Sequence, residues 1–271
     1  MSVSTSLVPD LPATAEAELA RAYAQLEDVS FAVRLAALVG QPVEALKARL
    51  PGALQNGLDS AVRRALSAAM QAALKSDPAR TPVPVASIWF HRGMAAASGA
   101  AGGAFGLPGT LVELPVSTTL LLRQIAAVAA QNGENLSQPT IAAECLKVFA
   151  LGGRDVRDDA AESGYFAVRL ALAEALKNFA GRGLAAATLP GFIGPIAARF
   201  GGPVALKLSA QMAPLVGAAT GAAVNLAFLE HFRGVAEGHF TVRRLERIHG
   251  PQPVKRAYEA IAATRDARFN A

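Results

Sequence analysis

Apolar residues recur at three- and four-residue spacing along most of the chain, the pattern of amphipathic helices. Within residues 14–39 this pattern ends at Gly40, a residue suited to a helix C-terminal cap. The spacing predicts further helices over residues 42–50, 56–75, 86–103, 115–132, 139–151, 158–180, 184–200, 203–220, 221–249 and 253–268. No segment shows sustained alternation of apolar and polar residues. The sequence therefore predicts an all-α fold, a compact multi-helix bundle with no significant sheet.

A proline-rich segment divides the predicted helices into two groups. Residues 76–84 hold Pro78, Pro82 and Pro84 and cannot continue a helix. We therefore expect an N-terminal helical arm over residues 1–76 and a helical body over residues 85–271. A single merged domain is the alternative, because a chain of 271 residues lies near the upper limit for one hydrophobic core.

Two long segments, residues 93–112 and 208–229, contain no charged side chain. Their length suits a membrane span, but Ala and Gly, which dominate the first, contribute little to insertion. Glycines four residues apart leave bare backbone on one helical face, where a second helix can approach closely. The glycines in question are Gly99 with Gly103, Gly102 with Gly106, and Gly217 with Gly221. The spacing predicts close-packed central helices, either in a soluble core or in a hairpin that enters the membrane.

The net charge of +5 is concentrated near the C-terminus. Residues 231–271 hold eight Lys or Arg against four Asp or Glu. Such a surface suits anionic lipid, RNA or an acidic partner, although the interleaved acids equally suit a solvated helical face. We expect no nucleic-acid partner. The first residues lack the features of an export signal and the single Cys145 fits a reducing compartment, so we expect a cytoplasmic protein at the inner face of the cell membrane.

Residues 225–250 are the most distinctive stretch. On a helix, an apolar stripe carries His239 with His231 beside it; the other members are Phe228, Phe232, Val235, Val242 and Leu245. One interpretation is a metal or proton-transfer site made by these histidines with Glu230 or Glu113. The other is a pair of hydrogen-bonded core histidines, and it is favoured because their spacing is eight residues rather than the four of H-E-x-x-H. We expect no metal or cofactor.

Glu113 is the only charged residue between Arg92 and Arg123. It precedes Pro115, the expected first residue of the 115–132 helix, so the helix dipole would stabilise its carboxylate. The alternative is an ion pair with a cation from another helix, Arg243 or the histidine face. The candidate functional surface comprises Glu113, Arg123, Asn225, Glu230, His231, His239, Arg243 and Arg244.

Five segments together resemble the EcsC family of bacterial proteins. They are AAGGAFGLPGTLVELPVSTTLLLRQIA, VFALGG, SGYFAVRLAL, PLVGAATGAAVNLAFLEHF and GHFTVRRLERIHG, and the likeness extends over residues 95–258. The family takes its name from a protein encoded beside the two components of an ABC-type transporter implicated in secretion and regulated membrane proteolysis. The resemblance therefore implies work at the membrane, and it supplies no catalytic residue to carry over.

These observations lead to one expected function and two alternatives. We expect a non-enzymatic accessory protein whose partner is a membrane lipid surface or a membrane protein, such as an ABC-type transporter or a secretion system. The first alternative is a carrier of lipid or another apolar ligand, since Ala/Gly helices can leave a groove between them. The second is a metal-dependent hydrolase using Glu113, Glu230, His231 and His239.

Overall fold

The computed structural model describes residues 11–28, 30–40, 42, 52–75, 88–153, 164–180, 189–211 and 218–269. Within its helices, the surroundings of residues 52–56, 72–75, 88–91, 99–113, 139, 175–180, 189–192, 211, 218 and 266–269 are not described. The short helix predicted over residues 42–50 lies outside the described residues except for Pro42, and so does the proline-rich segment 76–84.

Every regular element in the described part of the chain is a helix, which confirms the predicted all-α fold. The helices are α1 (Ala13–Leu26), α2 (Phe31–Val39), α4 (Gly52–Lys75), α5 (Ile88–Gln131), α6 (Pro139–Leu151), α7 (Tyr165–Ala180), α8 (Leu189–Gln211), α9 (Ala218–His249) and α10 (Pro251–Phe269). Gly40 has a φ of 61° and caps α2 in the left-handed conformation, as predicted.

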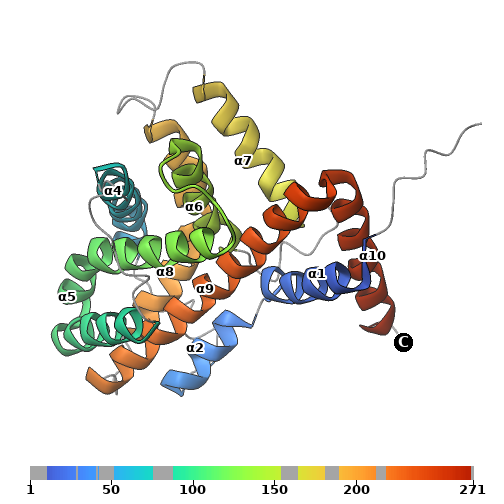
Figure 1. Ribbon diagram of the computed structural model, residues 1–271. Coiled ribbons are helices and arrows are strands. Elements are labelled where there is room, and N and C mark those ends of the chain that lie inside the picture. The colour runs from blue at the N-terminus through green and yellow to red at the C-terminus, as the bar shows by residue number, and fades with distance from the viewer. Residues whose placement is uncertain are drawn as a thin grey trace, which may run out of the picture.

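Helix α9 is the centre of the molecule. It crosses the structure diagonally and packs against α1, α2, α5, α6, α8 and α10 (Figure 1). The apolar stripe predicted for it is buried, including Phe232 and the fully buried His239. Its packing on both early and late helices puts residues from both sides of the 76–84 segment into one core.

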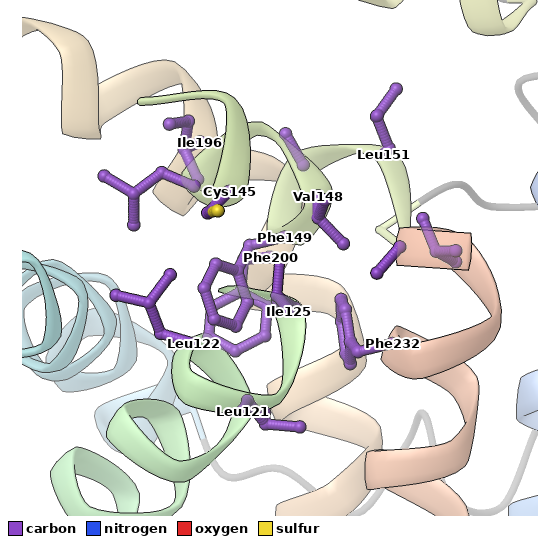
Figure 2. Close-up of a cluster of buried hydrophobic side chains, with 14 of the residues drawn as sticks. Leu121, Leu122, Ile125, Cys145, Val148, Phe149, Leu151, Ile196, Phe200 and Phe232 are labelled. Carbon is purple, nitrogen blue, oxygen red and sulfur yellow. The ribbon is translucent and has the colours of Figure 1, made fainter. Parts of the chain in front are cut away.

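The middle of that core is aromatic. Phe149 of α6, Phe200 of α8 and Phe232 of α9 lie with ring centroids 4.7 to 5.6 Å apart, which is the range of favourable tilted and edge-to-face contacts. Leu122 and Ile125 of α5 pack beside them (Figure 2). Four helices distant in sequence are therefore fixed to one another through side chains that interdigitate.

Two predicted helix breaks are wrong. The segments 86–103 and 115–132 form the single helix α5, which continues through Pro108 and Pro115 and is sharply bent (Figure 1). Likewise α8 continues through residues 200–203, where a boundary was expected, and contains both Pro195 and Pro203. Proline removes one helical hydrogen bond and bends the axis, but packing against neighbouring helices can hold the backbone helical on both sides.

One predicted helix is instead divided. The segment 14–39 breaks between α1 and α2, where the Asp28 carboxylate accepts the backbone N–H of Ser30 at 2.9 Å. An Asp side chain that bonds the backbone two residues later stabilises a turn in competition with the helix. The turn lets α1 and α2 follow different parts of α9.

Candidate functional site

The described parts of the two uncharged segments meet beside the first half of α9, in a region that we call the uncharged end and define as residues 93–98 and 218–229. Asn225 of α9 is buried, and its amide nitrogen donates to the carbonyl oxygen of Ala95 and to Ser98 Oγ, both at 2.9 Å. The beginning of α5 is therefore attached to the first half of α9. Among the described residues, no helix is long and apolar enough to cross a membrane.

The second half of α5 reaches the same place. A cavity of about 10 Å³ is lined from both halves of α5, by Ser98 and by Ser117 among others, and by Asn225 and Phe228 of α9. Such a volume holds one water molecule at most. Both halves of the bent α5 therefore pack on α9, and this cavity is far too small for an acyl chain.

A buried lysine closes this region from the side of α8. Lys207 is fully buried, its Nζ donates to Ser117 Oγ at 3.3 Å, and it lies 5.2 Å from the ring centroid of Phe228. One helical turn before Ser117, the backbone of α5 passes through Glu113. Glu113 therefore lies inside a helix, and its predicted position just before a helix N-terminus is wrong.

The predicted close-packing glycines are only partly visible. Gly221 is buried on α9, one turn before Asn225. The surroundings of Gly99, Gly103 and Gly106 in α5 lie outside the described residues, and so does Gly217. Close approach of a second backbone at these positions stays a prediction.

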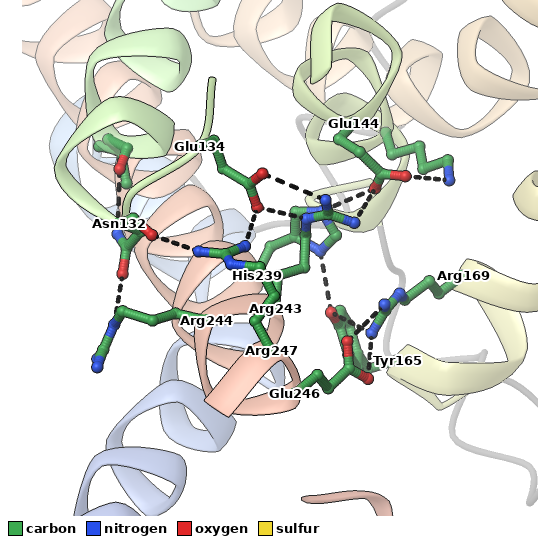
Figure 3. A network of polar contacts seen from close by, with 12 residues as sticks. Asn132, Glu134, Glu144, Tyr165, Arg169, His239, Arg243, Arg244, Glu246 and Arg247 are labelled. Carbon is green, nitrogen blue, oxygen red and sulfur yellow. Dashed lines mark hydrogen bonds and ion pairs between the residues drawn. The ribbon is translucent and has the colours of Figure 1, made fainter. Parts of the chain in front are cut away.

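At the other end of α9, its arginines hold the turn that follows α5. Arg243 Nε lies 2.8 Å from a carboxylate oxygen of Glu134, and Arg247 binds the same carboxylate (Figure 3). Arg244 donates to the Asn132 side chain at 3.2 Å. Between these two anchors, Gly133 takes a φ of 78°, which disfavours residues with a side chain. These contacts fix the C-terminal end of α5 against α9.

Next to these arginine contacts lies a group of connected polar side chains, which we call the Glu144 network. It consists of Glu144, Lys147, Tyr165, His239 and Arg243. Glu144 Oε1 accepts from Lys147 at 2.8 Å, and Glu144 Oε2 lies 3.3 Å from His239 Nε2 and 3.5 Å from Arg243. The other ring nitrogen, Nδ1, lies 2.9 Å from the Tyr165 hydroxyl. The network joins α6, α7 and α9 through side chains (Figure 3).

The protonation states in this network follow from burial and charge. Burial lowers the pKa of His239, and the opposing effect of Glu144 does not outweigh it. Burial alone would raise the pKa of Glu144, but the hydrogen bond from His239 and the charges of Lys147 and Arg243 lower it strongly. Burial raises the pKa of Tyr165. A neutral His239 thus donates a hydrogen bond from Nε2 to the carboxylate of Glu144. Its Nδ1 accepts a hydrogen bond from the Tyr165 hydroxyl group.

His231 does not join His239. Its ring is buried, donates from Nε2 to the carbonyl oxygen of Gly152 at 2.8 Å and stacks on Phe31 with centroids 4.4 Å apart. Burial lowers its pKa, so it too is neutral near pH 7. Both histidines are hydrogen-bonded core residues, as the favoured interpretation held. No group of three or more His, Cys, Asp or Glu in the described part of the chain could hold a metal ion.

The remaining candidate residues are distributed over the surface of the helices. Glu230 is half-buried and pairs with Arg92 at 2.8 Å and with Arg233 at 3.4 Å. Arg123 is exposed on α5. Arg243, one of the proposed partners of Glu113, binds Glu134 and Glu144; the surroundings of Glu113 are not described, so its pairing stays a prediction. The described candidate residues therefore do not form one site.

Sequence reasoning missed the partners that these residues have on other helices. Glu134, Glu144, Tyr165, Arg169 and Glu246 all take part in the contacts of Figure 3, and Arg169 binds Glu246 through two hydrogen bonds of 2.8 and 2.6 Å. One signal was present. Glu144 and Lys147 are the two charged residues of a helix that is otherwise almost entirely apolar, and charges in such a buried helix require partners.

Fold and contacts together define an all-helical protein in which arginines of the central helix are bound to carboxylates of other helices. The segments GHFTVRRLERIHG and SGYFAVRLAL, which carry the resemblance noted in the sequence, supply His239, Arg243, Tyr165 and Arg169 to these contacts. The chain belongs to the EcsC protein family, whose model matches residues 14–245. No curated protein and no solved structure matches it.

Proposed function

We propose that this protein is a non-enzymatic accessory protein that binds the cytoplasmic face of the membrane through its uncharged end. The observation that carries the proposal is the meeting of two segments without charge, tied together by Asn225. Its described solvent-facing residues are Gly93, Met94, Ala97 and Ala219. Such a surface can enter the headgroup region without stripping water from an ion, which is the main cost of burying charged side chains.

The charged half of the molecule supports a structural role for the histidine segment. The Glu144 network is buried, and the cations nearest to His239 are already bound to carboxylates. A substrate would have no free acid or base to meet there. Membership in the EcsC family favours a membrane protein, such as an ABC-type transporter or a secretion system, as a protein partner of the same surface.

Flotation with liposomes tests the proposal. We expect the purified protein to float with vesicles and Met94→Glu to reduce the floated fraction severalfold, because a carboxylate would have to enter the headgroup region. Leu170→Glu is the matched control, since Leu170 is exposed on α7, on the opposite side of the molecule from the start of α5 (Figure 1). Emission of Trp89, the single tryptophan, gives a second readout close to residue 93.

The proposal fails if the protein stays wholly in the soluble fraction at low salt with anionic and zwitterionic vesicles present. It also fails if Leu170→Glu reduces flotation as much as Met94→Glu does. Circular dichroism of both variants establishes that they keep their helical content.

A further inference from the structure

The charged residues that border the uncharged end neutralise one another. Arg92 and Glu230 flank the two uncharged segments in sequence and form an ion pair of 2.8 Å. Arg233 also contacts Glu230, at 3.4 Å, and binds Glu237 at 2.7 Å. The described part of this border therefore carries two positive and two negative charges in alternation. These paired charges offer no net attraction to anionic headgroups.

Several basic residues of the C-terminal part lie away from the uncharged end and are bound to carboxylates. Arg243 and Arg247 bind Glu134, and Arg244 binds Glu18 of α1. These contacts are made by the second half of α9, whereas the uncharged end includes its first half. Three of the eight basic residues of this region are thus bound to carboxylates of other parts of the chain.

Helix α2 packs on the part of α9 that belongs to the uncharged end. Its Phe31 ring lies 5.7 Å from that of Phe228 in α9. On its outer face Val33 is 62% exposed and Leu38 is 42% exposed. The single charged residue of α2, Arg34, binds Asp28 at 2.7 Å. Among the described residues of α2 and the uncharged end, only a few large apolar side chains are therefore available for insertion, and Arg34 and Arg92 beside them are both paired with carboxylates.

We propose, building on the function proposed above, that this surface recognises hydrocarbon exposed between loosely packed lipids, as in strongly curved bilayers, and not anionic headgroups. Few apolar side chains without electrostatic attraction bind weakly to a tightly packed surface. The same side chains bind well where gaps between headgroups already exist. Interfacial helices of this kind depend on curvature and lipid composition.

Flotation with zwitterionic phosphatidylcholine vesicles of two sizes tests this inference. We expect roughly tenfold tighter binding to small, highly curved vesicles than to large vesicles of the same lipid. Adding anionic phosphatidylglycerol to the large vesicles should not strengthen the weak binding to them. Raising the salt concentration should leave binding to small vesicles within about twofold. Val33→Glu should abolish the preference for small vesicles, whereas Leu170→Glu should keep it, both positions being 62% exposed.

The outcomes separate this inference from the proposed function. Equal binding to small and large vesicles overturns the inference and leaves membrane binding intact. Binding that requires phosphatidylglycerol and falls with salt also overturns it, in favour of headgroup recognition. Equal losses in Val33→Glu and Leu170→Glu show that the contact lies elsewhere. Absence of binding to every vesicle overturns both proposals.

Discussion

Glu144 is the residue whose removal should destabilise the described structure most clearly. Its carboxylate accepts hydrogen bonds from Lys147 and His239 and forms an ion pair with Arg243 at 3.5 Å, and the side chain of Lys147 is only 4% exposed. In Glu144→Gln one amide oxygen remains to accept, while the NH₂ group must face a donor, either Lys147 or the His239–Arg243 pair. Breaking a buried ion pair by removing one partner costs about 3–5 kcal/mol, so we expect a loss of about 3 kcal/mol in the free energy of unfolding.

Urea denaturation at pH 7 measures this loss, and Glu230→Gln is the matched control. Glu230 also binds two cations, Arg92 and Arg233, but its side chain is 37% exposed. Exposed pairs contribute about 0–1 kcal/mol, so the control should lose less than about 1 kcal/mol. Equal losses in the two variants would refute the claim that burial makes the Glu144 network different.

The pH dependence provides an independent check. The pKa of Glu144 is lower in the folded than in the unfolded protein, where it is near 4.5. Its stabilisation is therefore fully present above about pH 4.5 and is lost as the pH falls toward the folded pKa. The difference between the wild type and Glu144→Gln should accordingly shrink below about pH 4.5. Because His239 is held neutral in the folded protein, the free energy of unfolding falls as the pH drops below about 6.5. This effect is expected in the pH profiles of both the wild type and Glu144→Gln.

Further substitutions test the helix packing, each by thermal or urea denaturation. Gly238→Ala should cost about 1–3 kcal/mol, because the new methyl group would lie 2.9 Å from a backbone oxygen of α1, whereas Gly234→Ala, with nothing within 4 Å, should gain about 0.5–1 kcal/mol. The reverse order would refute the close contact of α1 and α9. Gly221→Leu should cost more than about 1–3 kcal/mol by overpacking; an unchanged melt would count against it.

Much of the fold could be predicted because helical periodicity depends on burial, and burial follows from the apolar stripe of each helix. The stripe of α9 is buried as expected, and α6 begins and ends at the expected residues. The predicted breaks in α5 and α8 were wrong because proline and glycine affect local free energy by a few kcal/mol, and packing along neighbouring helices outweighs that amount. The free energy of packing between helices cannot be read from the local sequence.

The candidate site was harder to predict than the fold. His239 and Arg243 were identified because both lie on one distinctive helix, but their partners Glu134, Glu144 and Tyr165 come from segments 74 to 109 residues away. Spacing along a chain reports neighbours on the same helix and nothing about the next helix. The charges of Glu144 and Lys147 in an otherwise apolar helix were the one indication that buried polar contacts must exist there.

The positions of the charges also change what the net charge of +5 means. Taken from the sequence, the basic residues after position 231 suggested a surface for anionic partners. In the fold, Arg243, Arg244 and Arg247 bind carboxylates of α1 and of the turn after α5, so their charge holds helices together. Helix α9, whose 32 residues span about 48 Å, links this paired half to the uncharged end. Over that distance the charges are largely screened at physiological salt, so Arg243, Arg244 and Arg247 contribute little electrostatic field at the uncharged end.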